Sequence, residues 1–227
     1  MAWINLNSPS VREEPGHYLP FLWPEGDFHP LAKVSDRSDI GLLHLLGHRR
    51  TKRSFAPLSE ADLSQLLWRC AHTQALADSE YGFELERRPT LSAGAIHPIH
   101  ILIDHHATGC WQRYDSRHHG LHDLPEASSL LAELRLQCDS TLAVGPGTRV
   151  LLVAEPGKTS AKYQNCESLI WRDAGVLLAM MAMVTEALGC TFCPLGITGE
   201  PWASQLAPTG ILTGVGVALV GGLPDSA

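Results

Sequence analysis

SLIWRDAGVLLAMMAMVTEAL, residues 168–188, is the apolar stretch around which the fold of this chain has to be built. Its few charged residues stand near its ends, and Gly189 follows it, where a glycine commonly ends a helix. The stretch has fewer than the roughly 20 uninterrupted apolar residues needed to cross a bilayer. A helix that is apolar almost all round is buried on every side, so we expect a helix inside a large domain or at a subunit interface.

Outward from this helix, the apolar pattern predicts further helices and strands. Ser59, with acidic residues in the turn after it, is typical of a capped helix start. The apolar stripe of that helix consists of Leu63, Leu66, Leu67, Cys70 and Ala71. Strands are predicted at residues 99–103, 149–154 and 211–220, a hairpin strand at 111–114 and a helix at 130–136. The mixture indicates one α/β or α+β domain.

The N-terminal 40 residues differ from the rest of the chain. They are rich in Pro, Trp, Tyr and acidic residues and have no helical or strand periodicity. We therefore expect residues 1–40 to form an arm that lies across another surface, and residues 41–227 to form the folded domain.

Composition narrows the classes of protein that fit. The formal net charge is -7, whereas binding of a phosphate backbone needs a basic face, so we expect no nucleic acid. The N-terminus lacks the pattern of a secretory signal, and scattered cysteines fit reduced thiols, so a cytoplasmic protein without a membrane segment is expected. Cys190 and Cys193 have C-x-x-C spacing, but Pro194 follows where a redox pair would open a helix. Core thiols are therefore favoured over a redox or metal pair, and no metal site is predicted.

The basic segment, His48-Arg49-Arg50-Thr51-Lys52-Arg53, is the most concentrated charge in the sequence. It holds four of the seventeen Lys and Arg residues of an acidic chain. Guanidinium groups match two phosphate oxygens at once, and a hydroxyl adds a further donor. The segment indicates a site for one small phosphate group, and the alternative is a solvated charged turn.

Two further segments are typical of a site that holds a flat ligand. Residues 88–98 read RPTLSAGAIHP, and small residues there let the backbone approach a ligand closely. Residues 193–197 read CPLGI and follow the long apolar helix, where they offer a loop with backbone amides.

Taken in order, these segments resemble the nitroreductase family of FMN enzymes. Residues 49–55, RRTKRSF, resemble the family's R-R-S-x-R-x-F opening, and residues 171–175 with the P-x-G loop at 194–196 resemble its later helix and loop. Residues 88–98 resemble the R-P-S-x-S-A-G-A-L-Y-P segment of the SagB-type dehydrogenases, a branch that includes the azoline oxidases. The resemblance covers roughly residues 45–220.

The resemblance implies a fold, a cofactor and an assembly. The fold would be an α+β sandwich with a mixed central sheet flanked by helices, in an intertwined homodimer with FMN at the subunit interface. The implied cofactor-binding residues are Arg49, Arg50, Thr51, Arg53, Arg88, Pro89, Ser92, Ala93, Gly94, Pro194, Leu195 and Gly196. Arg49 and Thr51 would hold the phosphate, and Arg53 would approach the flavin edge where negative charge collects. The amides of Leu195 and Gly196 would face the hydride-accepting N5 atom.

Lys162-Tyr163 is the clue to the chemistry within this branch. Azoline oxidases carry a Lys-Tyr pair just before the buried helix, as this chain does. Converting a thiazoline or oxazoline to the aromatic azole removes a proton and a hydride, and a phenol beside an ammonium can take the proton. The resemblance thus implies Lys162 and Tyr163 as catalytic residues, with a peptide or carrier-bound molecule as substrate and other biosynthetic enzymes as partners. The alternative for the pair is a surface dipeptide at a helix start.

Several departures from the family pattern keep other functions open. His97 and Thr90 replace the usual Tyr and Ser, Asp173 replaces the commoner Glu, and no Lys or Arg follows Arg172 to supply a second phosphate-binding cation. One alternative is an NAD(P)H-dependent reductase of nitro compounds or quinones on the same fold. A further alternative is a non-catalytic docking subunit of a biosynthetic complex.

Overall fold

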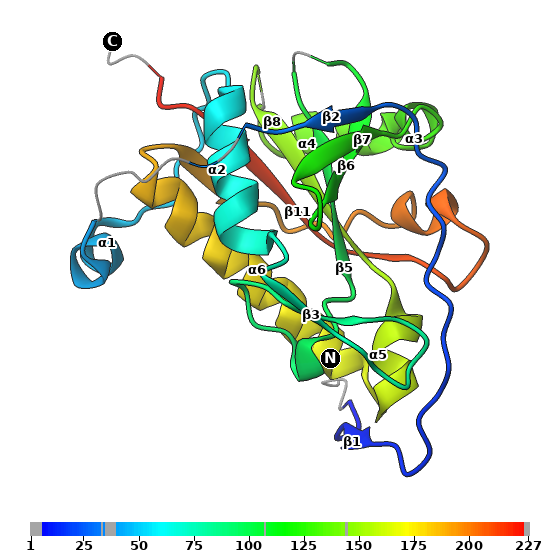
Figure 1. The fold of residues 1–227 in the computed structure, drawn as a ribbon. Coiled ribbons are helices and arrows are strands. Elements are labelled where there is room, and N and C mark those ends of the chain that lie inside the picture. Colours follow the sequence, from blue (N-terminus) through cyan, green and yellow to red (C-terminus); the bar gives the residue numbers. More distant parts are fainter. Residues whose placement is uncertain (1–5, 33, 35–39, 107, 144, 225–227) are drawn as a thin grey trace.

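The computed structural model describes residues 6–32, 34, 40–106, 108–143 and 145–224. Its centre is a seven-stranded sheet in the order β10-β11-β8-β5-β6-β7-β2, flanked by helices (Figure 1). The strands are β2 (Phe28–Pro30), β5 (Ile99–Asp104), β6 (Trp111–Asp115), β7 (Gly120–Asp123), β8 (Thr148–Ala154), β10 (Thr191–Pro194) and β11 (Thr213–Gly221). The α+β class is confirmed, and every pairing that this chain contributes to the sheet is antiparallel in the described residues.

Helices cover both faces of this sheet, as Figure 1 shows. α2 (Glu60–Ala71) and α6 (Glu167–Ala187) pack on one face, against alternate residues such as Ile101 and Leu152. α3 (Ala127–Leu130), α4 (Ala132–Thr141) and the 3-10 turn η2 (Ala203–Leu206) pack on the other face, against Leu102 and Leu151. Successive strand residues point to opposite faces, so these apolar strands are buried on both sides.

The predicted helix starts and central strands agree with the structure. The Ser59 hydroxyl accepts a hydrogen bond from the Asp62 amide at 3.0 Å and caps α2, whose predicted apolar stripe is buried. The strand predicted at residues 149–154 is β8, which lies between β11 and β5. Gly189 stands just after the C-terminal end of α6 with φ of +71°, a conformation that costs glycine less than it costs other residues.

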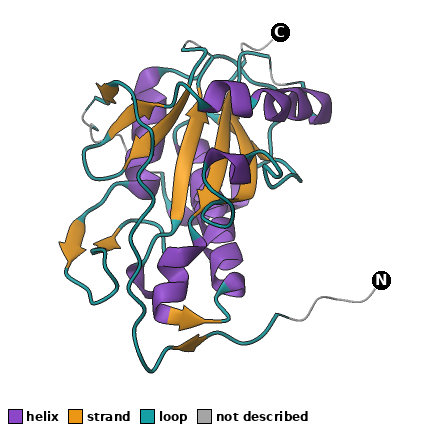
Figure 2. Cartoon of the chain, turned by 90° about the vertical axis from the view of Figure 1, so that its right-hand side faces the viewer, coloured by secondary structure: helices purple, strands orange, loops and turns teal. Residues whose placement is uncertain are grey.

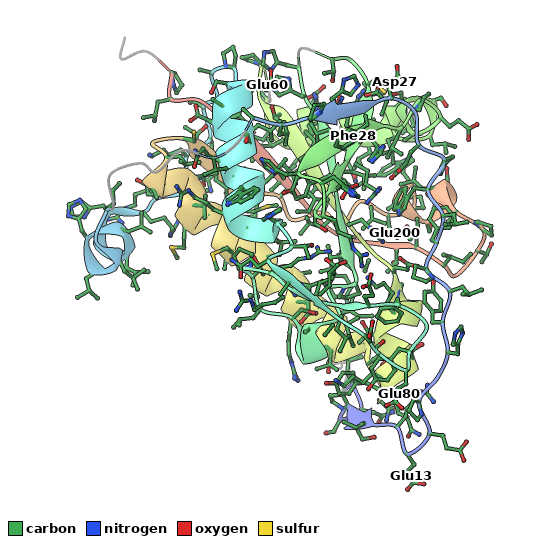
Figure 3. The ribbon with its side chains drawn as sticks, in the orientation of Figure 1. Glu13, Asp27, Phe28, Glu60, Glu80 and Glu200 are labelled. Carbon is green, nitrogen blue, oxygen red and sulfur yellow. The ribbon has the colours of Figure 1, made fainter. Side chains whose placement is uncertain are left out.

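The N-terminal residues run along the molecule as an extended arm. Figure 2 shows this arm passing the length of the fold on the side that faces the viewer. β1 (Ser10–Val11) pairs with β9 (Tyr163–Gln164), and β2 joins the edge of the main sheet, where Figure 3 labels Phe28. Phe21 and Trp23 of the arm pack on the cluster beneath α3 and α4. The arm therefore covers the domain's own core.

α6 is buried along one face within a single chain. Ile170, Ala174, Leu177 and Met181 face the core, whereas Trp171 is 48% exposed. Burial on every side is therefore wrong for one chain, which leaves a subunit interface as the remaining prediction. α6 is long and apolar enough to cross a membrane, but core helices of soluble proteins pass the same test, and no membrane protein is indicated.

Candidate active site

The Ser-Ala-Gly bend (residues 92–94) precedes β5 and has an unusual backbone. It contains the 3-10 turn η1 (Ala93–Ala95), in which Gly94 has φ of +64°. Ala95 and His97 also have positive φ, at 58° and 47°. Left-handed residues other than glycine are uncommon and cost energy, and they cluster at functional sites. The sequence shows the small residues here but gives no sign of the strain.

Asp173 of α6 holds this bend in place. Its carboxylate accepts hydrogen bonds from the Ser92 hydroxyl at 2.6 Å and from the Ala93 amide at 3.1 Å. The Ser92 hydroxyl oxygen in turn accepts a hydrogen bond from the His97 amide at 3.0 Å. Burial raises the pKa of Asp173, although the bonds from Ser92 and Ala93 oppose that effect. Asp173, a departure from the family's Glu, thus serves as the anchor of the bend.

The Lys-Tyr pair (Lys162 and Tyr163) is distant from this bend in the sequence but contacts it in the fold. A Cβ built on Gly94 would lie 2.8 Å from Tyr163 Oη and 2.9 Å from Lys162 Nζ. Both polar tips therefore lie against the backbone of Gly94, whose φ of +64° favours glycine. The pair is not a surface dipeptide, since both side chains are half-buried.

The Lys-Tyr pair is positioned by α5 (Pro156–Lys162) and by the arm. α5 ends at Lys162, and Tyr163 begins β9, where it lies opposite Val11 of β1. The Arg12 amide donates a hydrogen bond to the Lys162 carbonyl oxygen at 2.9 Å. The rings of Tyr81 and Tyr163 lie 5.6 Å and 5.7 Å from Lys162 Nζ. The arm is thus part of the site, a role that the sequence did not predict.

The basic segment lies elsewhere, directly after α1 (Leu42–His48). Arg50, Thr51 and Arg53 are exposed and Arg49 is half-buried. Arg49, Arg50 and Arg53 form no ion pair with any carboxylate that the structure describes. Arg50 Nη1 donates instead to the carbonyl oxygens of Gly47 and Arg49, at 3.3 Å and 2.9 Å. The segment therefore has cations available for an anion.

The loop at residues 194–196 lies beside this basic segment. Arg53 hydrogen-bonds the Cys193 thiol, which opposes the rise that burial causes in the pKa of Cys193. The Lys52 amide donates to the Phe192 carbonyl oxygen at 3.4 Å. The Leu195 amide donates to the Val217 carbonyl oxygen at 2.8 Å, so the expectation that it faces a ligand is wrong. The Gly196 amide makes no backbone hydrogen bond within the described chain, so it alone of the two can face a ligand.

The two groups of predicted residues are separated along α6. Lys52 contacts Glu186 in the last turn of α6 at 3.4 Å, whereas the Ser-Ala-Gly bend is anchored at Asp173. Thirteen residues of helix span about 20 Å at 1.5 Å per residue. Figure 1 shows the same separation, with α1 beside the end of α6 and α5 beside its start. One chain does not bring the basic segment to the bend.

Arg88 and Pro89 directly follow the hairpin of β3 (Ala75–Ala77) and β4 (Leu85–Arg87) and precede the bend in the chain. Arg88 forms a buried ion pair with Glu86 at 2.6 Å. Burial would raise the pKa of Glu86, but Arg88 and hydrogen bonds from Thr73 and Arg117 lower it to about 2. Arg88 therefore has a carboxylate partner of its own in this chain.

Sequence reasoning missed one residue that organises this end of the molecule. Glu155, buried after β8, accepts hydrogen bonds from Tyr18 at 2.9 Å and from the Phe21 amide, and pairs with His100 at 2.8 Å. Burial would raise its pKa, but the bond from His100 leads the effects that lower it. Glu155 thereby ties the arm to β5 and α5. A lone acidic residue between an apolar strand and a proline was the available signal.

Comparison with solved structures identifies the fold. A protein assigned as a nitroreductase from Ralstonia eutropha matches with a TM-score of 0.67 and 19% identity, over 94% of this chain and 99% of that one. The Escherichia coli microcin synthetase McbBCD with truncated pro-MccB17 bound matches with a TM-score of 0.56 and 15% identity, over 84% of this chain and 76% of that one. A protein assigned as a nitroreductase from Desulfovibrio desulfuricans, in complex with FMN, matches with a TM-score of 0.51 and 15% identity, over 84% and 93%.

These likenesses are structural. No protein-family model matches the sequence, and no curated protein matches it. At such low identity the matches establish the shared architecture, and the roles of individual residues have to be argued from this chain. The chain has the nitroreductase-like α+β fold.

Proposed function

We propose that this protein is an FMN-dependent oxidoreductase of the SagB type that oxidises a thiazoline or oxazoline, in a peptide or peptide-like molecule, to the azole. The observation that carries the proposal is the meeting of Tyr163 Oη and Lys162 Nζ at the backbone of Gly94. A general reductase has no need of a phenol and an ammonium at this point. The microcin synthetase among the matched structures, which has a pro-peptide bound, supports a peptide substrate.

The residues present fit FMN in chemistry. The guanidiniums of the basic segment, which pair with no described carboxylate, suit a phosphate, and they would replace the second cation that the C-terminal part of the chain lacks. The Ser-Ala-Gly bend offers a close backbone surface for a flat ring, with Pro89 and Arg88 before it. Pro194 and the free amide of Gly196 would border the ring from the other side.

The separation of these groups supports a homodimer. One chain holds the phosphate-binding cations about 20 Å along α6 from the bend. A second copy packed on the exposed apolar side of α6, which includes Trp171, would bring its bend to the first chain's basic segment. The cofactor site is then complete only between two chains, as the family resemblance implies.

In the proposed reaction, the hydride and the proton leave the substrate for different acceptors. The flavin, when bound, accepts a hydride from the substrate ring. Tyr163 Oη takes the proton that leaves the neighbouring ring carbon, and the Lys162 ammonium compensates negative charge at that oxygen. Asp173 keeps the bend, and with it this geometry, fixed through Ser92. We place the reaction in the cytoplasm, beside the enzymes that build and release the peptide.

The test starts with the visible spectrum of the purified protein, which should be that of bound FMN. Anaerobic addition of a thiazoline-containing peptide should bleach the spectrum, and mass analysis after aerobic turnover should show the loss of two hydrogen atoms from the peptide. A colourless protein that takes up no added FMN would contradict the cofactor, and it would favour a docking subunit.

A reductase is the second candidate, since two matched structures are assigned as nitroreductases. Anaerobic mixing with NAD(P)H separates the two functions. Rapid bleaching by NAD(P)H, together with no reaction of the thiazoline peptide, would identify a reductase.

A further inference from the structure

A polar cavity of about 250 Å³ lies where β5, β6 and α5 meet the β3–β4 hairpin and the arm. Its walls come from the β3–β4 hairpin, from β5 and β6, from α5 and from Pro20 of the arm. His97, which follows the Ser-Ala-Gly bend by three residues and also has positive φ, lines it too. Its volume is slightly below that of sites for drug-sized ligands, so it suits a small molecule.

Lys158 is the unusual residue of this cavity. It is only 8% exposed, and its ammonium donates one long hydrogen bond, of 3.4 Å, to the His97 carbonyl oxygen. Its other neighbour is the ring of Phe83, whose centroid lies 5.1 Å away. An ammonium has three donors, and Lys158 forms no ion pair with any carboxylate that the structure describes. A buried cation without a counter-ion is costly to the fold.

The nearby carboxylates are already committed to other partners. Glu155 accepts from Tyr18 and pairs with His100, and Glu86 pairs with Arg88 and Arg117. Neither lies within ion-pair distance of Lys158. Burial, followed by the charge of Arg88, lowers the pKa of Lys158 to about 8, and the more distant charges of Glu155 and Glu86 oppose this lowering only in part.

The remaining groups of the cavity favour an anion. Arg88, Arg113 and Arg117 line it beside Lys158, and each is paired with a carboxylate. His97 and His100 are neutral near pH 7, because burial lowers their pKa values to about 3 and about 4. Glu84 and Asp115 are the other acids of the lining, and they are paired with Arg117 and His118. Among the charged side chains of this wall, Lys158 alone has no ionisable side chain as a partner in the described part of the chain.

We propose that this cavity is a binding site for a small organic carboxylate, whose oxygens accept hydrogen bonds from the Lys158 ammonium and complete its ion pair. The apolar wall of Phe83, Ile99 and Pro20 would take the carbon skeleton of that acid. The site does not depend on the flavin, and it is linked to the Ser-Ala-Gly bend because His97 lines the cavity and its amide donates to the Ser92 hydroxyl.

Calorimetric titration of the purified protein with succinate tests the site, with succinamide as the uncharged control. Succinate should bind and raise the thermal midpoint, whereas succinamide should do neither. Lys158→Met should weaken succinate binding roughly tenfold or more, because a charged hydrogen bond is lost. The matched control is Arg87→Met, which removes an exposed cation between two residues of the cavity wall and should leave binding unchanged.

Stability separates this role from a structural one. Lys158→Met replaces an unpaired buried cation by an apolar side chain, so the ligand-free variant should melt at the same or a higher temperature than the wild type. A variant that melts lower and still binds succinate would overturn the proposal, as would a wild type that binds no succinate or an Arg87→Met variant that loses as much affinity.

Reductive methylation of the wild-type protein gives an answer even where the variant does not fold. Mass mapping should show that succinate protects Lys158 from formaldehyde and borohydride while Lys162, one helical turn away, reacts as before. Equal labelling of Lys158 with succinate and with succinamide would overturn the proposal.

Discussion

The side chains at the two ends of α6 differ in their exposure and in their partners. The basic segment lies at its last turn, where Arg50 and Arg53 are exposed, Arg49 is half-buried, and none of the three pairs with a carboxylate among the described residues. The Ser-Ala-Gly bend lies near the start of α6. Asp173 accepts a hydrogen bond from this bend, and the Lys-Tyr pair contacts it. The arm pairs with the strand that contains Tyr163. The cations at the end of α6 are available to a ligand, whereas the groups near its start already contact one another.

This difference indicates where each part of the proposed chemistry is prepared. An exposed cation cluster binds an anion at little structural cost, because its groups keep their water until the ligand arrives. A base that takes a proton from carbon has to be held in position, and strained backbone with buried hydrogen bonds provides that. Changes at the enclosed end should therefore affect turnover and folding, and changes at the basic segment should affect cofactor affinity.

Among the variants considered, Tyr163→Phe should have the largest effect, which is on the rate of oxidation. Removing the phenol removes the proposed base, and general-base catalysis contributes about 10²–10⁴-fold to a rate. Oxidation of a thiazoline peptide should therefore fall at least about 100-fold, while FMN content in the visible spectrum stays the same. The measurement is single-turnover bleaching under anaerobic conditions. Unchanged bleaching would remove Tyr163 from the mechanism, and loss of the flavin colour would make it a structural residue instead.

The enclosed end should also give the fold a sensitivity to acid. The pKa of Glu86 is lowered from 4.5 to about 2 in the folded chain, so its contribution to stability is complete above pH 4.5 and is lost as the pH falls toward 2. A lowering of this size corresponds to roughly 3 kcal/mol, since each pKa unit is about 1.4 kcal/mol. Glu86→Gln should reduce the free energy of unfolding at pH 7 by about this amount or less, and should flatten its fall between pH 4.5 and 2.

Urea unfolding across this pH range gives the measurement. Glu80→Gln is the control, because Glu80 is exposed in the turn of the same hairpin, as Figure 3 shows. An acid dependence that is the same in wild type and Glu86→Gln would show that the ion pairs with Arg88 and Arg117 do not stabilise this end.

The sequence predicted the elements of this fold better than it predicted the contacts between them. The helix from Ser59, the strand at residues 149–154 and the apolar helix after Glu167 carry their pattern locally, in periodicity and caps. The anchoring of Ser92 by Asp173 joins residues that are far apart in the sequence, and it depends on how α6 packs on β5. No local pattern encodes such a distance.

The candidate site shows the same limit. The resemblance to flavin enzymes picked out the bend and the Lys-Tyr pair separately, and the structure brings them together at Gly94. The buried Glu155 and Lys158 were missed because a single charged residue in a sequence looks the same whether it is buried or solvated. The Leu195 amide was wrongly assigned to the ligand because strand pairing, which the sequence does not reveal, uses it.

Arg49→Ala tests the exposed end of the comparison. A charged hydrogen bond contributes about 1.5–3 kcal/mol, so the FMN dissociation constant should rise about 10–100-fold. The thermal midpoint of the flavin-free protein should stay unchanged, because Arg49 has no ion-pair partner among the described carboxylates. Fluorescence titration of FMN gives the affinity, and Arg87→Ala, which removes an exposed guanidinium elsewhere, is the control. If the two variants change the FMN dissociation constant equally, the basic segment is a solvated turn and not a phosphate site.

Gly94→Ala has a smaller expected effect on stability than Glu86→Gln and tests the enclosed end most directly. Gly94 has φ of +64°, and an L-residue in the left-handed region costs roughly 1–2 kcal/mol. The added methyl would also meet Tyr163 Oη and Lys162 Nζ, the ends of flexible side chains that can move away. The variant should therefore fold, lose about 1–2 kcal/mol of stability and oxidise substrate more slowly.

Gly109→Ala separates backbone strain from displacement of the Lys-Tyr pair. Gly109 has the same φ of +64°, and a Cβ there would meet nothing within 4 Å. It should lose as much stability in urea unfolding as Gly94→Ala while keeping the wild-type rate. If the two variants oxidise the peptide equally fast, the contact of the pair with the bend has no part in turnover, and the enclosed end is a folding device. If only Gly94→Ala is slow, the position of the two polar tips, and not the stability of the fold, sets the rate.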